Sequence, residues 1–404
     1  METLILSKIS GFTDNNHINT TQAMISLRTI YQKDLSLAFR NNLATFLEEG
    51  FPTDSKELWL KRFSVWWDAN PAVSETTPCG WVLADFDDLT IYGFRGNIPV
   101  NYQHNQEQLF GSASTAWYVS KDFRREYSTK IFEQQLLMEN VDLFVATTPA
   151  PPVKKRMLKN GFHVINEGES TTIYLTLTNL HLFSSQLSKK FSREAIVKKG
   201  WDYRITKILA TGFSVVSRCL PRPGKGGRLQ VLSDGKYEVH QCSDVAEFLP
   251  YVSQHQEIGA VEYAKDVNTL HWLLFSPEIQ NLLSRTVNLI FTVSGEYVGY
   301  FIYDLEQMYG EKTLRIREMK LLCDDMGILS LIIKHAKTVA RNNACSGVFV
   351  TVLSPESGLY GLLEKKFLLK LRSEGRYCVL FRSGGNDMYL RYRMSDLDPD
   401  GGVI

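Results

Sequence analysis

Apolar and polar residues alternate along this chain in blocks that predict a mixed α/β protein. Residues 21–48 carry apolar side chains three and four positions apart, which predicts a helix. Asp54-Ser-Lys-Glu57 has the capping-box pattern and opens a second helix that ends before Pro71. The rest of the first half predicts strands at 3–9, 81–84, 89–94, 114–119, 143–147, 163–165 and 171–177, and helices at 128–138 and 153–160. Two pairs of these strands, 81–84 with 89–94 and 163–165 with 171–177, are predicted to form hairpins.

The second half predicts the same kinds of element in the same order. Its strands are expected at 236–240, 289–293, 297–303, 313–322, 348–353 and in two last segments that reach about residue 381, and its helices at 244–252, 268–274, 328–342 and 358–365. The agreement in order points to a duplicated architecture.

The chain also matches itself residue by residue. Three landmarks recur at a constant offset of 206 residues (272 minus 66 for the tryptophans): Trp66, Pro71 and Gly93 return as Trp272, Pro277 and Gly299. With a one-residue slip, 143–147 aligns with 348–352, and Gly161-Phe162 with Lys366-Phe367. Because tryptophan and proline are rare, we interpret the halves as two copies of one domain. Coincident alternation in two unrelated domains is the alternative.

Length and composition agree with a multidomain globular protein. The chain has 404 residues, of which 44% are hydrophobic and 22% charged, and this predicts two or three domains. Its formal net charge of +1 supplies no global field that would attract nucleic acid or an anionic membrane. Six scattered cysteines show no zinc-site or disulfide-framework spacing, and we expect no metal. No secretory signal or transmembrane stretch is visible, so a reducing cytoplasm is the expected compartment.

Glycine and proline mark a boundary between the halves. The run Pro221-Arg-Pro-Gly-Lys-Gly-Gly-Arg228 predicts a flexible connection. The predicted division is an N-terminal domain at 1–180, a linker with a helical segment at 181–234, a C-terminal domain at 235–386 and a tail at 387–404. Residues 198–218 mix basic and apolar side chains and fit either weak contact with a membrane surface or an inter-domain helix.

The order of elements in each half resembles the GNAT fold of acyl-CoA-dependent N-acyltransferases. Strand, two helices, three strands, helix, strand, helix and two strands are the order in that family, and the resemblance covers most of both halves. It implies an α/β (α+β) fold of two tandem GNAT-like domains, each with a mixed, mostly antiparallel sheet flanked by helices. It also implies acetyl-CoA or another acyl-CoA as the cofactor.

The resemblance implies where the cofactor lies. In GNAT proteins the pantetheine arm lies where the fourth strand splays from the fifth, and the pyrophosphate meets the N-terminus of the next helix. The equivalent residues here are Trp117, Tyr118, Val119, Arg124, Arg125, Glu126, Tyr127, Ser128 and Thr129. The family's two glycine positions carry Tyr127 and Thr129, whose side chains would narrow the approach, whereas the two arginines supply suitable charge. In the second half, Asp324 and Asp325 would repel a pyrophosphate, so the first half is the expected cofactor site.

The catalytic groups are less well specified. The position of the family's general-acid tyrosine carries Met157 in the first half and Leu362 in the second. Ser114, Tyr118 and Glu318 are the candidate catalytic residues, and Glu318 is placed on a central strand as a general base would be. The absence of a general-acid tyrosine does not exclude acyl transfer. In a ternary complex of protein, acyl-CoA and acceptor, correct positioning of a neutral amine is enough.

Two short stretches suggest an acceptor. Gly96-Asn97-Ile98-Pro99 and residues 265–272 resemble GNAT-like proteins of bacterial polysaccharide clusters. That resemblance implies a bacterial acyltransferase acting on a small amino or hydroxy acceptor, such as an amino-sugar intermediate. Two alternatives remain: a non-catalytic GNAT-like binding or scaffold protein, and an aminoacyl-tRNA-dependent transferase, which the near-neutral charge disfavours.

Overall fold

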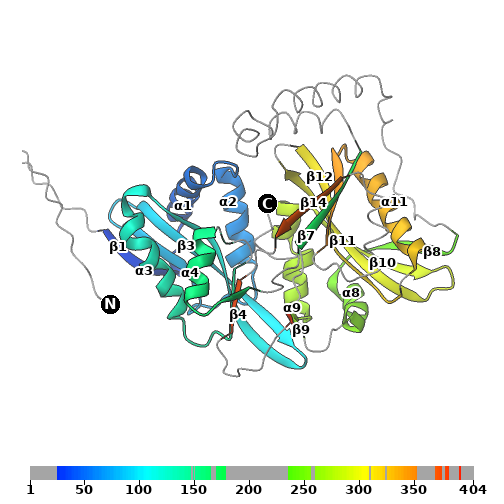
Figure 1. Cartoon of the computed structure of the whole chain (residues 1–404), viewed down its shortest axis with the longest axis horizontal. Helices are drawn as coiled ribbons and strands as arrows, with labels where there is room; N and C mark the ends of the chain where they lie inside the picture. The colour runs from blue at the N-terminus through cyan, green and yellow to red at the C-terminus, as the bar shows by residue number, and fades with distance from the viewer. Residues whose placement is uncertain are drawn as a thin grey trace, which may run out of the picture. The chain divides into compact units, whose positions relative to one another are not determined.

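The computed structural model describes residues 25–146, 149, 151–164, 170–178, 235–255, 260–308, 311–323, 325–352, 369–374, 378–381 and 391–392 (Figure 1). These residues form two compact units. Unit 1 contains the described residues up to 164 and the strand β15 (Cys378–Phe381), and unit 2 contains the remainder. The predicted strand at 3–9, the helix at 358–365, the segment 198–218 and the tail from 395 lie outside the described residues.

Unit 1 places helices on both faces of one mostly antiparallel sheet. Its elements are β1 (Ile25–Tyr31), η1 (Gln32–Asp34), α1 (Leu37–Gly50), α2 (Lys56–Phe63), the π-helical turn η2 (Ser64–Asp68), β2 (Pro78–Asp85), β3 (Thr90–His104), β4 (Glu107–Val119), the 3-10 turn η3 (Lys121–Phe123), α3 (Arg124–Leu136), β5 (Leu143–Ala146), α4 (Pro151–Lys159) and β6 (His163–Val164). The strand order is β1-β2-β3-β4-β5-β15-β6. On β3, Phe94 packs on Trp67 of η2, whereas its neighbour Arg95 stacks on Phe132 of α3. Successive strand residues face opposite sides, so η2 and α3 cover opposite faces.

The start of unit 1 corrects one prediction. Residues 25–31 form the strand β1, which pairs antiparallel with β2, although their apolar spacing predicted a helix over 21–48. The helix begins only after Ser36, whose side chain accepts a hydrogen bond from the backbone N–H of Phe39. β-Branched and aromatic residues fill the first part of this stretch and favour an extended backbone, so the helix prediction was wrong there.

Unit 2 repeats this design. Its elements are β8 (Tyr237–Cys242), α8 (Val245–Val252), η4 (Ser253–His255), β9 (Ala260–Tyr263), α9 (Val267–Leu270), the π-helical turn η5 (His271–Phe275), α10 (Pro277–Leu283), β10 (Arg285–Thr292), β11 (Tyr297–Met308), β12 (Glu311–Leu321), α11 (Met326–Asn342), β13 (Gly347–Val352), β14 (Leu369–Glu374) and β16 (Arg391–Tyr392). The sheet order is β14-β7-β13-β12-β11-β10-β8, where β7 is Ser170–Leu177. One side of α11 packs on this sheet and buries Ile328, Ile332, Ala336 and Val339.

The residues that revealed the repeat occupy equivalent places in the two units. Trp66 and Trp272 each lie in a π-helical turn, and both are fully buried. Gly93 and Gly299 lie on β3 and β11, the second strands of the two corresponding hairpins. A Cβ at Gly299 would meet the carbonyl oxygen of Lys320 at 2.4 Å, so only glycine allows the strands this approach. The prediction of two tandem α/β domains is confirmed.

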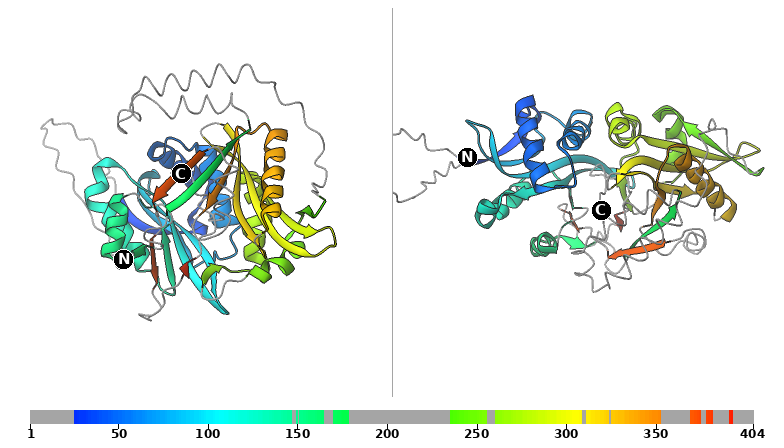
Figure 2. Two further views of the ribbon diagram at one scale, coloured as in Figure 1. Left: turned by 45° about the vertical axis from the view of Figure 1, so that its right-hand side comes forward. Right: turned by 90° about the horizontal axis from the view of Figure 1, so that it is seen from above.

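The two units exchange strands. β7 comes from the first half of the chain but lies between β13 and β14 of unit 2, where it pairs antiparallel with both (Figure 2). β15 comes from the end of the chain but lies between β5 and β6 of unit 1. The predicted hairpin of 163–165 with 171–177 is therefore wrong, and the last two strands also separate into different sheets. Neither unit is therefore one continuous stretch of the chain. The domain boundaries near residues 180 and 235 stay a prediction.

Candidate functional site

β4 and β5 pair in parallel over a short distance. Their pairing covers Gly111–Ala113 with Leu143–Val145, and β4 continues to Val119. Just after the last pair, the Oγ of Ser114 donates a hydrogen bond to the carbonyl oxygen of Val145 at 3.1 Å. The resemblance implies that the pantetheine arm lies beyond this point. Ser114 acts there as a link between the two strands.

A β-bulge lies just beyond this point. Gly96 pairs with Thr115 and Phe94 with Tyr118, so Arg95 alone faces two residues of β4. One of these, Ala116, has a φ of 48°, in the left-handed region. A bulge bends its strand and increases the local twist.

Unit 2 has the same arrangement. β12 pairs in parallel with β13 only from Leu314 to Ile316. The pairing of β11 with β12 then shifts register at Arg317. In both units, the strand that carries the bulge (β4 or β12) passes the end of its parallel pairing with the next strand (β5 or β13) close to the bulge.

The N-terminus of α3 follows the bulge and presents positive charge. Its N-cap residue is Phe123, which makes no side-chain capping bond, and the backbone N–H of Arg124 donates to the carbonyl oxygen of Lys121 in η3. Arg124 and Arg125 open the helix and are both exposed. The Nε of Arg124 donates to the carbonyl oxygen of Val119 at 2.8 Å, and its guanidinium lies over the ring of Tyr118 at 5.6 Å. The helix dipole and the two arginines favour an anion at this end.

Several residues of the predicted site make packing contacts within unit 1. Tyr118 faces α1, with its ring 4.9 Å from that of Phe46. Trp117 stacks on Phe132 at 5.6 Å, and Val119 is buried. Tyr127 is 5% exposed, so its side chain does not cover the helix end as its position in the sequence suggested.

The remaining residues of the turn lie on the outer side of α3. Glu126 pairs with Lys130 across one helical turn, and Ser128 is partly exposed. The Oγ1 of Thr129 accepts a hydrogen bond from the Nη1 of Arg156 on α4. This contact joins the two helices close to the start of α3.

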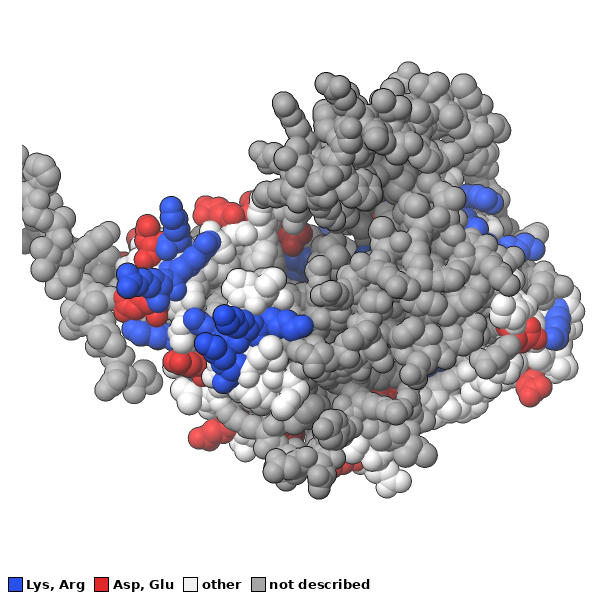
Figure 3. Space-filling view, viewed as in Figure 1, with Lys and Arg blue, Asp and Glu red and all other residues white. Residues whose placement is uncertain are grey.

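The sequence interpretation missed a group of basic residues on α4. Figure 3 shows Lys and Arg side chains gathered over this part of unit 1. The basic residues of α3, of α4 and of the turn before α3 are Lys121, Arg124, Arg125, Lys130, Lys154, Lys155, Arg156 and Lys159. Because Arg156 contacts Thr129, the charges of α4 add to those at the N-terminus of α3. The basic run Lys154-Lys155-Arg156 is visible in the sequence. Its contact with α3 depends on the tertiary structure, which the sequence pattern does not report.

The equivalent helix N-terminus in unit 2 is already satisfied. Asp325 is the N-cap of α11 and accepts hydrogen bonds from the backbone N–H of Gly327 at 2.6 Å, the Nζ of Lys236 at 2.6 Å and the phenol of Tyr237 at 2.5 Å. The hydrogen bonds from Lys236 and Tyr237, with that from Gly327, lower the pKa of Asp325 to about 2. A protein carboxylate therefore occupies the place that a phosphate would take. Asp324, the other predicted acidic residue, lies outside the described residues.

The catalytic candidates belong to different units: Ser114 and Tyr118 lie on β4 of unit 1, and Glu318 lies on β12 of unit 2. Glu318 lies on β12 at the bulge, where its Oε1 accepts a hydrogen bond from the phenol of Tyr300 at 3.0 Å. Burial, together with the Glu318 carboxylate, raises the pKa of Tyr300 well above its ordinary value. Met157 is 1% exposed in the apolar core beneath α3 and α4. Leu362 lies outside the described residues.

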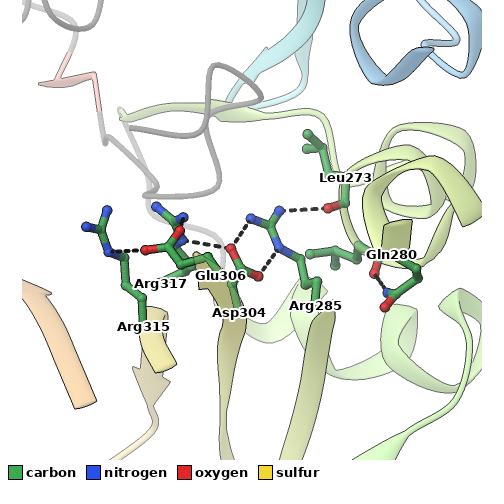
Figure 4. Close-up of polar contacts among 8 residues, drawn as sticks. Leu273, Gln280, Arg285, Asp304, Glu306, Arg315 and Arg317 are labelled. Atoms are coloured by element: carbon green, nitrogen blue, oxygen red, sulfur yellow. Dashed lines mark hydrogen bonds and ion pairs between the residues drawn. The ribbon is translucent and has the colours of Figure 1, made fainter. Parts of the chain in front are cut away.

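A buried ionic network crosses three strands of unit 2 (Figure 4). The carboxylate of Asp304 accepts from Nε and Nη2 of Arg285 at 2.7 and 2.8 Å and from Nε of Arg317 at 2.7 Å. Glu306 pairs with Arg317 and, at 3.1 Å, with Arg315. Burial would raise the pKa of Asp304, but the two guanidiniums hold it below its usual value. These charges fix the strands in register at the bulge of β12.

Among the described residues no group of three or more His, Cys, Asp or Glu side chains is arranged to hold a metal ion. The described cysteines, Cys79, Cys242, Cys323 and Cys345, are all free. In the described part of the chain, no helix has both the length and the apolar character needed to span a bilayer.

Comparison with known proteins addresses the fold. The sequence matches no protein-family model and no curated protein. A probable N-acyltransferase from Enterococcus faecalis V583 is similar in structure, with a TM-score of 0.50 and 9% identity over 88% of this chain and 72% of its own. Saccharomyces cerevisiae N-myristoyltransferase with bound myristoyl-CoA gives a TM-score of 0.52 and 10% identity over 91% of this chain and 81% of its own.

The chain has a tandem GNAT-like fold. Each GNAT-like unit carries the bulge, but the helix that follows begins with two arginines in the first unit and is capped by Asp325 in the second. At these levels of identity the similarity concerns the fold, and the chemistry must be argued from the residues.

Proposed function

We propose that unit 1 binds an acyl-CoA and that the protein transfers the acyl group to an amine or hydroxyl. The observations that carry this proposal lie at the end of β4: a bulge opposite Arg95, then the 3-10 turn η3, then the N-terminus of α3 with the exposed Arg124 and Arg125. We propose that the pantetheine arm lies beside β4, beyond its last pair with β5. The helix end suits a pyrophosphate, because backbone N–H groups and the dipole both favour an anion.

The basic residues of α4 support the same assignment. CoA carries a third phosphate on its ribose, and Lys155 and Lys159 are exposed on α4, whose Arg156 contacts Thr129 of α3. In unit 2 the carboxylate of Asp325 takes the equivalent place, so we propose a single cofactor site. The proposal names no single acyl chain: it covers acetyl-CoA and longer acyl-CoAs.

The test is calorimetric titration with CoA, acetyl-CoA and myristoyl-CoA. Arg124→Ala removes one charge at the helix end and should weaken binding about tenfold, the value of one charge-assisted contact of roughly 1.5 kcal/mol. The Lys155→Ala/Lys159→Ala variant should weaken binding and reduce its dependence on salt. Lys334→Ala, an exposed residue of α11, is the matched control and should change nothing. No binding of any of these ligands at millimolar concentration would overturn the proposal.

A non-catalytic binding role is the second candidate, and one observation favours it. The buried Met157 stands where the resemblance implies a general acid, and a thioether supplies no proton. Binding without acyl transfer to a panel of amines and hydroxyl compounds would support this role.

For the acceptor of the acyl group, the proposal gives a chemical class and no single compound. We propose a small amino or hydroxy compound, such as an amino-sugar intermediate, in a cytoplasmic bacterial setting. Glu318 stays a candidate base on β12, where its carboxylate accepts a hydrogen bond from Tyr300. An aminoacyl-tRNA donor would instead require binding of tRNA, which a gel-shift measurement tests directly.

A further inference from the structure

A cavity of about 680 Å³ lies in unit 1 at the C-terminal end of α3. Its wall is formed by residues of β1, of the loop between η2 and β2, of the first parts of β2 and β4, and of the segment 134–140. Cavities of this size hold small organic molecules. The N-terminus of α3, with Arg124 and Arg125, lies about 20 Å away along this helix of 13 residues, so the cavity is separate from the proposed cofactor site.

The charges around the cavity favour a cation. Among the described residues of its wall, Glu139 alone carries a formal charge at neutral pH, and it is exposed. Gln134 and the segment 137–140 place the last turn of α3 at the cavity, where the backbone carbonyl groups carry partial negative charge. Lys33 is not part of the wall: it is exposed, with its Nζ 5.8 Å from the centre of the Tyr31 ring.

The charged residues of α3 are arranged against the preference of an isolated helix. Acidic side chains stabilise a helix N-terminus and basic side chains its C-terminus. α3 instead begins with Arg124 and Arg125, and its last turn contains Glu133 and no basic residue. Glu126, the acidic residue of the first turn, pairs with Lys130. Departures from a local stability rule are typical of functional positions, and this one leaves the negative end of the helix uncompensated at the cavity.

The cavity also offers contacts for a hydrocarbon chain. Tyr31 and Phe110 are partly exposed in its wall, and the face of an aromatic ring attracts a cation. Trp81 and Met138 belong both to the wall and to the apolar core of unit 1. Leu137, which is 68% exposed, adds further apolar surface. A ligand with a charged end and an apolar chain therefore finds a partner for each part.

The loop on one side of the cavity is held in place by its own hydrogen bonds. The Oγ of Ser74 lies 2.7 Å from the Oγ1 of Thr77, which also accepts the backbone N–H of Ser74 at 3.1 Å. Asn70, which is 4% exposed, donates to the carbonyl oxygen of Pro99 at 2.8 Å and accepts from the backbone N–H of Ala72 at 2.9 Å. The wall is therefore ordered before a ligand arrives, which lowers the entropic cost of binding.

We propose that this cavity binds a small organic cation, a protonated amine that carries an apolar chain. The ammonium group lies near Glu139 and the last turn of α3, and the chain packs against the aromatic and aliphatic side chains of the wall. This inference does not depend on the proposed function, because none of the residues that we assign to the cofactor lines the cavity. It gives unit 1 a second ligand site.

The experiment is an NMR titration of the nitrogen-15-labelled protein at pH 7 and low salt with hexylamine, 1-hexanol and hexanoate. Hexylamine should bind at least about tenfold more tightly than hexanol, because only its ammonium makes a charge-assisted contact. Hexanoate should bind most weakly of all. The amide signals of Thr29, Ser74 and Asn140 should shift together, since these residues lie in different parts of the wall. Equal affinities for hexylamine and hexanol, no saturable binding of hexylamine, or shifts confined to other residues would overturn the proposal.

Two variants test the charge itself. Glu139→Gln removes the negative charge with little change of shape and should weaken hexylamine about tenfold, while hexanol stays within about twofold. Glu133→Gln is the matched control, an exposed carboxylate of α3 outside the cavity wall, and should change neither affinity. Unchanged binding of hexylamine by Glu139→Gln would contradict the assigned position of the ammonium. Calorimetric titration of Glu139→Gln with CoA should match the wild type, so a failure of CoA to bind concerns the proposed function alone.

Discussion

Asp325 accepts a hydrogen bond from the backbone N–H of Gly327 at 2.6 Å, so the first turn of α11 is held by a carboxylate of the protein itself. The corresponding turn of α3 has no such group. Two copies of one architecture thus differ at a helix N-terminus: an aspartate caps the helix in unit 2, whereas the helix in unit 1 begins with two exposed arginines.

Removal of this cap should weaken unit 2. Asp325→Ala should lower the free energy of unfolding by about 1 kcal/mol at pH 7, the usual cost of a lost N-cap. Asp325→Asn keeps a capping oxygen and should lose less. Because the pKa of Asp325 falls to about 2 on folding, its charge stabilises the fold above about pH 4 and ceases to do so as the pH falls toward 2. Urea denaturation of the three proteins at pH 7 and pH 3 should show their stabilities converging in acid; a constant gap would contradict this.

The buried ionic network should be far more sensitive than an exposed pair. Arg317→Met leaves the fully buried Asp304 with one guanidinium in place of two, and we expect a loss of about 3–5 kcal/mol. Lys130→Met breaks the pair with Glu126, in which both side chains are more than 40% exposed, and should cost less than about 1 kcal/mol. Denaturant midpoints compare the two directly. Similar losses would show that the network does not hold the sheet of unit 2 together.

These two predictions also show what the sequence could and could not reveal. Trp66 and Trp272 revealed the duplication because rare residues kept their spacing, and α11 was predictable from its regular apolar side. The sequence of β1 was predicted as a helix because the spacing of Leu27 and its apolar neighbours fits both the helical period and the strand period. The network of Arg317 and the position of Arg95 depend on partners distant in sequence, which periodicity does not report.

His335 should make the protein sensitive to mild acid. It is 6% exposed on α11 and lies against Phe301, and burial lowers its pKa to about 4. The unfolded chain takes up a proton near pH 6.5 and the folded one only near 4, so stability falls as the pH drops between these values. At pH 5 the loss should be about 2 kcal/mol relative to pH 7.5. His335→Leu should lose that much less than the wild type over the same range, as measured by urea denaturation.

A substitution at the end of the chain should disturb the candidate cofactor site. Val379 of β15 pairs with Val145 of β5 on one side and with His163 of β6 on the other. Val379→Pro removes a backbone N–H from the middle of this sheet, whereas Val379→Ala keeps it. We expect Val379→Pro to speed amide exchange in β5 and to weaken CoA binding at least tenfold, with Val379→Ala near wild type. Unchanged exchange in β5 would contradict the pairing.

The strand exchange also sets the time at which this protein is completed in the cell. Unit 1 lacks the strand between β5 and β6 until residues 378–381 have been made, which is more than 200 residues after β6 itself. At bacterial or eukaryotic synthesis rates the gap lasts roughly 10–40 s, during which the edge of β5 has no native partner on that side. The candidate cofactor site therefore belongs to the finished chain, and a ribosome that stops early releases a sheet with an open edge.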